Sequence, residues 1–177
     1  MKTILTKEQL DEGVDRLAWE TQQYYQQQPL TIIGVLTGCI MLVADLVRRV
    51  DLPVRIGFVQ ASSYRGNATT PGQLIIKLET LPDIKDRHVL IVDDIFDTGH
   101  TMKELLERLR QHEPASLRTM VLLRKHGRKE VSLEPDHVGF EIPNEFVVGY
   151  GLDYQDMYRN LPFLGALEAE EIARGAV

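Results

Sequence analysis

The stretch VLIVDDIFDTGHTM, residues 89–102, decides the expected fold of this chain. Four apolar residues, 89–92, lead directly into two adjacent acids, Asp93 and Asp94. The turn sequence DTGHT follows at residues 97–101, and a helical spacing of apolar residues begins at its end. A buried strand, a tight turn and a helix in this order are typical of an α/β fold. In such folds, ligands bind at the carboxyl ends of parallel strands.

Outside this stretch, strand and helix patterns continue to alternate. Thr6 and Gln9 have the spacing of a capping box, and Pro29 should end the helix that they begin. The other predicted segments are strands at 30–36, 54–60, 73–79, 89–93 and 118–124 and helices at 40–50 and 101–111. Short apolar runs from His137 onward predict a small subdomain of short strands and loops. We therefore expect a mainly parallel central sheet with helices on both faces.

The segment ASSYRGNATTPG, residues 61–72, has a different composition from its neighbours. It contains almost nothing that could be buried, and its glycines and proline favour turns. A polar connection of this length is more often functional than a simple link. We expect a mobile loop here.

Composition limits the classes of function. The 177 residues carry a formal net charge of −6, which argues against a general nucleic-acid binder with a basic face. The single cysteine, Cys39, permits no intrachain disulfide and fits a reducing compartment. No apolar run approaches the roughly 18 residues of a membrane span, and the first residues do not resemble a signal peptide. These features lead us to expect a cytoplasmic protein without membrane or nucleic-acid partners.

The chemistry of the opening stretch points to a phosphorylated ribose. The turn at 97–101 should present free backbone N–H groups at a helix N-terminus, where Gly99 allows close approach and Thr98 and Thr101 add hydroxyl donors. Asp93 and Asp94 would repel a phosphate, but carboxylates accept hydrogen bonds from sugar hydroxyls and bind hydrated Mg²⁺. Phosphate, diol and divalent metal are therefore expected within one strand–turn–helix unit.

Three other interpretations of the stretch compete with this one. A solvated strand end that is merely acidic would have no function. In a response-regulator receiver, paired acids lie near the start of the domain and a later strand ends in an aspartate, which this chain does not match. A dinucleotide site requires a GxGxxG sequence after a strand, and the chain has none.

Three segments together resemble a known family. VLIVDDIFDTGHTM resembles the phosphoribosyl-diphosphate signature of type I phosphoribosyltransferases. FEIPNEFVVGYGLDYQDMYRNLP, residues 140–162, resembles the tail of the hypoxanthine-guanine branch, and VLTGCIMLVADLVRRV, residues 35–50, followed by ASSYRG, resembles its diphosphate loop, helix and lid. The resemblance covers roughly residues 30–167. It implies one domain, 1–177, with a lid near 61–72 and a hood formed by the C-terminal tail and the N-terminal segment.

The resemblance also implies an activity and its substrates. The family transfers phosphoribose from phosphoribosyl diphosphate to N9 of hypoxanthine or guanine with Mg²⁺, which gives IMP or GMP and diphosphate in purine salvage. A homodimer or homotetramer is expected. The alternative is a regulatory RNA-binding protein on the same fold, which the net charge of −6 disfavours.

The implied roles follow the matching motifs. Asp97 and Lys125 are the expected catalytic residues, beside purine N7 and O6. The expected metal ligands are Asp153, Asp93 and Asp94, of which the last two also hold the ribose. The remaining expected substrate contacts are Thr98, Gly99, His100 and Thr101 at the 5′-phosphate, Phe146 and Val147 at the base, Thr37, Gly38 and Arg159 at the diphosphate, and Ser63 and Tyr64 at the lid tip.

Each of these residues also has a structural explanation. Phe146 alone would usually belong to a core, Lys125 to a solvated basic surface, and Asp153 with Arg159 to a surface ion pair. The chain departs from the family pattern at Thr37, where lysine is usual, and at Cys39, where a smaller residue is usual. The first acid is Asp93 where Glu is frequent, and the lid is short. The joint occurrence of the motifs in family order favours the functional interpretation.

Overall fold

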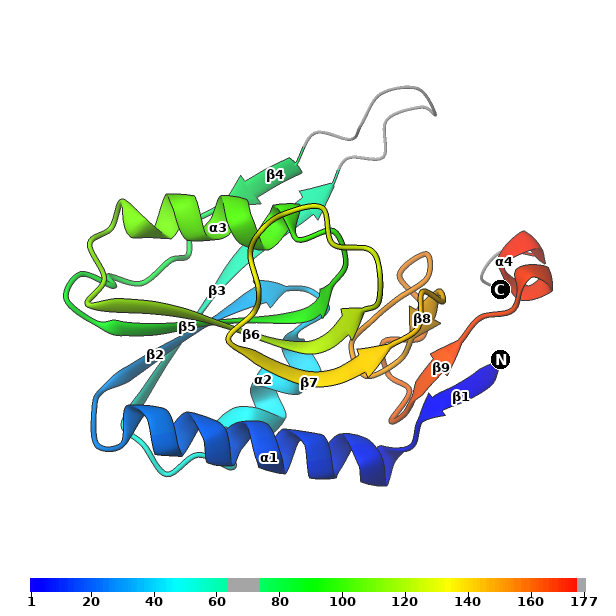
Figure 1. Ribbon diagram of the computed structural model, residues 1–177, viewed down its shortest axis with the longest axis horizontal. Coiled ribbons are helices and arrows are strands. Elements are labelled where there is room, and N and C mark those ends of the chain that lie inside the picture. The colour runs from blue at the N-terminus through cyan, green and yellow to red at the C-terminus, as the bar shows by residue number, and fades with distance from the viewer. Residues whose placement is uncertain (64–73, 175–177) are drawn as a thin grey trace.

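A computed structural model describes residues 1–63 and 74–174. Its main element is a six-stranded sheet in the order β4-β3-β2-β5-β6-β7 (Figure 1). The strands are β2 (Leu30–Leu36), β3 (Val54–Ser63), β4 (Leu74–Lys77), β5 (His88–Phe96), β6 (Ser116–Lys125) and β7 (His137–Ile142). All neighbours pair in parallel except β3 and β4, which pair antiparallel at one edge. The expected mainly parallel sheet is confirmed.

Helices cover both faces of this sheet, as predicted (Figure 1). On one face, α1 (Lys7–Tyr25) and α2 (Ile40–Val47) contribute residues such as Leu17 and Leu46 to a core cluster that also contains Ile32 of β2. On the other face, α3 (His100–Arg110) buries Leu105 against a second cluster that contains Ile91 of β5. The four apolar residues of β5 from 89 to 92 are all buried, as is typical of a strand inside a parallel sheet.

The helix starts follow local sequence signals. Thr6 caps α1 through the predicted capping box, because its side chain accepts from Gln9 N and the Gln9 side chain accepts from Thr6 N. α3 begins after Gly99, which has a φ of +90°, a left-handed conformation that favours glycine.

A second, three-stranded sheet lies beyond the carboxyl ends of the main strands (Figure 1). It contains β1 (Lys2–Leu5), β9 (Leu164–Ala166) and β8 (Val147–Val148), in that order and with antiparallel pairs. The first and last parts of the chain thus meet in one small sheet, and α4 (Ala169–Arg174) follows it. The position of this three-stranded sheet places the loop between β8 and β9 opposite the ends of β2 and β5.

Several predicted boundaries were wrong. β5 does not end at Asp93 but continues to Phe96, because pairing with β6 continues through Ile95 and Phe96. β3 continues to Ser63 because residues 60–63 pair with β4, so the polar connection begins later than predicted. α2 ends at Val47 rather than at residue 50, and neither β1 nor α4 was anticipated. Most of the predicted lid, including Tyr64, lies outside the described residues.

Candidate functional site

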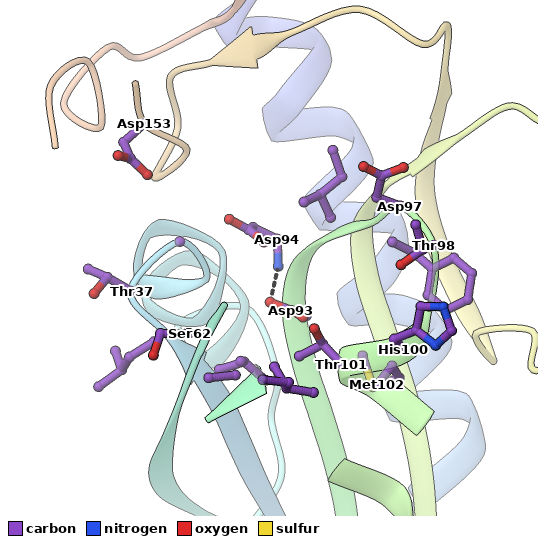
Figure 2. A pocket seen from close by; sticks show the side chains of 18 of the residues that line it. Thr37, Ser62, Asp93, Asp94, Asp97, Thr98, His100, Thr101, Met102 and Asp153 are labelled. Carbon is purple, nitrogen blue, oxygen red and sulfur yellow. Dashed lines mark hydrogen bonds between the residues drawn. The ribbon is translucent and has the colours of Figure 1, made fainter. Parts of the chain in front are cut away.

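A cavity of about 600 Å³ opens at the carboxyl ends of β2 and β5. This volume is within the usual range for small-molecule sites. Figure 2 shows Asp93 and Asp94 in its centre, Thr37 on one side, Asp97, Thr98, His100 and Thr101 on the other, and Asp153 facing them from the loop between β8 and β9. The residues predicted from sequence that line it are Thr37, Gly38, Asp93, Asp94, Asp97, Thr98, Gly99, His100, Thr101, Asp153 and Arg159.

The turn before α3 has the form expected of an anion cradle. Gly99 permits the tight turn, since a Cβ there would lie 2.4 Å from a methyl group of Val131 and 2.6 Å from the ring of Phe96. His100 and Thr101 occupy the first turn of the helix, where backbone N–H groups have no intrahelical partner and the helix dipole is positive. An anionic group such as a phosphate is the natural ligand of this end of the helix.

The two central acids are held as a close pair. Asp93 is buried and its Oδ1 accepts a hydrogen bond from the backbone N–H of Asp94 at 2.9 Å. Burial raises the pKa of Asp93 well above its ordinary value, and the neighbouring charge of Asp94 raises it further. Burial also raises the pKa of Asp94, although hydrogen bonds from backbone N–H groups and the charge of Arg159 oppose the shift. A group that donates hydrogen bonds, or a cation, would stabilise the ionised pair.

The turn at Thr37 and Gly38 packs directly on this pair. A Cβ at Gly38 would lie 1.6 Å from Oδ2 of Asp94, so only glycine leaves room for that carboxylate. Gly151 packs on the same turn, since a Cβ there would lie 2.1 Å from the carbonyl oxygen of Gly38. Two glycines therefore allow the acid pair, the turn and the loop between β8 and β9 to stack in contact. Cys39 is fully buried beneath the turn.

The loop between β8 and β9 carries an ion pair into the cavity. Arg159 Nη2 lies 2.9 Å from Asp153 Oδ1, and Arg159 Nη1 donates to the carbonyl of Gly151 at 2.8 Å. Both charged side chains line the cavity and both are about one-third exposed or less. This ion pair therefore lies in the site and not on a remote surface.

Asp97 forms ion pairs with two cations from the end of β6 and the loop after it. Arg128 Nε donates to Asp97 Oδ1 at 2.8 Å, and Lys125 Nζ lies 4.0 Å from Asp97 Oδ2. Lys125 lines a second cavity of about 380 Å³ and not the main one. The structure thus brings the two expected catalytic residues to within 4.0 Å of each other, although they line different cavities.

The two expected base contacts lie apart from the cavity lining. Phe146 packs edge-to-face on Tyr154 at 5.5 Å between ring centres, and Val147 is buried in β8, where it pairs with Ala166. Neither residue lines the 600 Å³ cavity. Their contact with a base stays a prediction. Ser63 is the last residue of β3, and the other lid residue, Tyr64, falls outside the described part of the chain.

Within residues 1–63 and 74–174, no group of three or more His, Cys, Asp or Glu side chains could hold a metal ion. No helix in the same part of the chain is long and apolar enough to cross a membrane.

Sequence reasoning did not identify Arg128 and Gly151 as parts of this region. Arg128 lies in a run of basic residues and nothing in the sequence distinguishes it from Arg124 or Lys129. Gly151 is one of several glycines in the tail. Only the folded chain shows which of them contacts the site.

Comparison with known proteins gives a consistent picture. Residues 1–155 match the model of the phosphoribosyl transferase domain. The hypoxanthine-guanine phosphoribosyltransferase of Streptococcus pneumoniae is 41% identical over 170 residues, which are 96% of this chain and 94% of that protein. Solved structures of a hypoxanthine-guanine phosphoribosyltransferase from Bacillus anthracis and a hypoxanthine phosphoribosyl transferase from Trypanosoma cruzi align with TM-scores of 0.89 and 0.90. They are 36% and 38% identical, and the alignments cover 95% and 98% of this chain and 99% and 94% of theirs.

Proposed function

The chain belongs to the phosphoribosyltransferase family, and from this premise we propose that it transfers 5-phosphoribosyl from phosphoribosyl diphosphate to N9 of hypoxanthine or guanine. The products are IMP or GMP and diphosphate, and the physiological role is purine salvage. One observation carries the proposal. A helix N-terminus suited to a phosphate, a carboxylate pair suited to ribose hydroxyls and an arginine suited to diphosphate line one cavity of about 600 Å³.

The proposed roles follow from the charges that the reaction develops. The C1′–oxygen bond to diphosphate breaks, its electron pair leaves with the diphosphate, and N9 of the base bonds to C1′. Arg159 and the backbone of the Thr37–Gly38 turn bind the leaving diphosphate, while the turn before α3 holds the 5′-phosphate. Asp93 and Asp94 accept hydrogen bonds from the ribose hydroxyls, which stabilise their ionised forms.

Asp97 and Lys125 are the proposed catalytic residues at the base. As N9 bonds to C1′, the proton on N7 has to leave, and the Asp97 carboxylate accepts it. Lys125 donates to O6. An acceptor and a donor 4.0 Å apart suit the neighbouring N7–H donor and O6 acceptor of a 6-oxopurine. Adenine, whose 6-amino group is a donor, meets the Lys125 donor instead. Phe146 adds stacking and the Val147 backbone contacts the base edge.

The residues present fit a Mg²⁺ ion bound with substrate. Mg²⁺ prefers oxygen ligands, keeps several waters and is usually held by one or two carboxylates together with substrate phosphates. The raised pKa values of Asp93 and Asp94 report a buried pair of like charges that a cation would stabilise. Asp153 would hold a second ion. When bound, Mg²⁺ neutralises negative charge on the leaving diphosphate.

We also propose a homodimer or homotetramer. Ile40 and Met41, at the start of α2, are 41% and 36% exposed, which is high for large apolar side chains beside a site. Sedimentation at several protein concentrations tests this; a monomer at all of them would exclude it.

The experiment compares four purines under one condition. With phosphoribosyl diphosphate and Mg²⁺, hypoxanthine and guanine should release diphosphate, xanthine should react poorly and adenine should be inactive. A backbone acceptor facing position 2 would accept the guanine amino group and disfavour the xanthine oxygen. Adenine within about tenfold of hypoxanthine in kcat/KM would remove Lys125 from its role, because a mispaired polar group is normally rejected far more strongly than that.

The alternative is a regulatory RNA-binding protein. None of the relatives described above supports it, and the net charge of −6 disfavours it. No turnover with any purine, together with salt-sensitive RNA binding, would establish the alternative and refute the enzyme.

A further inference from the structure

The contact between Arg128 and Asp97 has no role in the proposed function described so far. Arg128 Nε donates to Asp97 Oδ1 at 2.8 Å, well within hydrogen-bond range. Lys125 Nζ lies 4.0 Å from the other oxygen, Oδ2, which is too long for a hydrogen bond. Arg128 therefore holds one oxygen of the proposed base, while the second oxygen remains beside the cation that is proposed to bind purine O6.

The segment that carries Arg128 is itself attached to the turn before α3. Glu130 N donates to the carbonyl of Thr98 at 3.0 Å, and Glu130 Oε2 lies 2.9 Å from His100 Nε2. Val131 packs so closely on Gly99 that a Cβ there would overlap its methyl group. Through these contacts, residues 128–131 form a support for the turn that includes Asp97. The position of the Arg128 guanidinium is therefore defined relative to that turn.

A contribution to folding stability does not explain the Arg128–Asp97 ion pair well. The Arg128 and Asp97 side chains are 42% and 37% exposed, and ion pairs at such exposure contribute little to folding. The hydrogen bond matters more for the reaction rate. A carboxylate that accepts a proton from a substrate nitrogen must be placed accurately, because small displacements of a catalytic group have large effects on rate. The hydrogen bond fixes the rotation of the carboxylate and thereby determines which oxygen faces the base.

We propose that Arg128 is a positioning residue that orients the Asp97 carboxylate, so that Oδ2 faces purine N7 next to Lys125. This inference rests on the proposed function. Arg128 does not contact substrate in this scheme and acts only through Asp97. Its removal should therefore lower kcat while the KM for phosphoribosyl diphosphate changes little.

The chain offers a matched control. Arg124 is a neighbouring arginine of similar exposure, 34%, and it pairs with Glu134 and Glu141 instead of Asp97. Arg128→Met and Arg124→Met each remove one partly exposed cation from the same region. Only the first removes the hydrogen bond to the proposed base.

The experiment measures kcat, KM and melting temperature for wild type, Arg128→Met, Arg128→Lys, Arg124→Met, Asp97→Asn and the double variant Asp97→Asn/Arg128→Met. We expect Arg128→Met to lower kcat by roughly 10- to 100-fold, the scale of a misplaced catalytic group. Arg128→Lys should recover part of this loss because it keeps a cationic donor. Arg124→Met should retain the wild-type kcat. In the Asp97→Asn background, Arg128→Met should cause no further loss of kcat, because the proton acceptor that it orients is already absent.

Several outcomes of these measurements would contradict the proposal. A wild-type kcat in Arg128→Met, an equal loss in Arg124→Met, or losses that multiply in the double variant would overturn the positioning role. A reduced melting temperature with an unchanged kcat would also overturn it, since the role would then be structural. Absence of turnover by the wild-type protein would refute the proposed function itself, and the inference with it.

Discussion

Gly151 offers a quantitative test of how the loop between β8 and β9 supports the site. Its φ is +101°, and a Cβ would lie 2.1 Å from the carbonyl oxygen of Gly38. That oxygen cannot retreat, because Gly38 is itself packed against the carboxylate of Asp94. The strained backbone and the steric overlap in Gly151→Ala together predict a loss of about 3 kcal/mol in the free energy of unfolding.

For a chain of 177 residues, this loss should lower the melting temperature by roughly 6–12 °C. The KM for phosphoribosyl diphosphate should rise as well, because the displaced Gly38 turn is proposed to bind the diphosphate. Calorimetry measures the first effect and initial rates measure the second.

Gly127 provides the control for backbone strain alone. Its φ is +67°, and among the described residues no heavy atom beyond its chain neighbours lies within 4 Å of the position that a Cβ would take. Gly127→Ala should cost about 1 kcal/mol, since the strain is partly offset by the lower entropy of the unfolded alanine chain. If Gly151→Ala loses no more stability than Gly127→Ala and keeps its KM, the stacking of Gly151 on Gly38 does not support the site.

Three further predictions concern the acids of the cavity. Asp97→Asn keeps the size of the side chain but cannot accept the N7 proton, so turnover should fall by roughly 10²–10⁴-fold with little change in nucleotide binding; near-full turnover would leave Asp97 as a turn residue only. Asp93→Asn should unfold at a higher temperature than wild type at neutral pH, although it should be less active. The folded state raises the pKa of Asp93, so wild-type stability falls as the pH rises above the ordinary value of 3.8 and levels off above the raised pKa. The advantage of Asp93→Asn should therefore disappear in acid; a variant no more stable than wild type at any pH would contradict the destabilisation assigned to burial of the Asp93 carboxylate beside Asp94. Asp153→Ala should increase the Mg²⁺ concentration needed for half-maximal activity, whereas an unchanged Mg²⁺ titration would remove Asp153 from the metal site.

Much of the main domain could be predicted from local sequence. The limits of β2 were correct to the residue, because a mainly apolar run, buried from Leu30 to Val35 in a parallel sheet, lies between Pro29 and the Thr37–Gly38 turn. The capping box of α1 and the turn at Gly99 were also evident, since a capping box and a glycine in a turn are both recognisable from a few consecutive residues. The same short-range signals identified the sequence from Asp93 to Thr101 as a candidate phosphate and ribose site.

Long-range contacts determined the rest. β5 extends to Phe96 because β6 pairs with it, and β1 exists because β9, about 160 residues away, pairs with it; neither partner can be inferred from local periodicity. The sequence alone gave no reason to distinguish Arg128 from Arg124, because both are arginines in one basic run. The folded chain turns one toward Asp97 and the other toward Glu134 and Glu141. Chemical type is a property of each residue, but the partner of a charged side chain depends on which distant segments the packing of the sheet brings together.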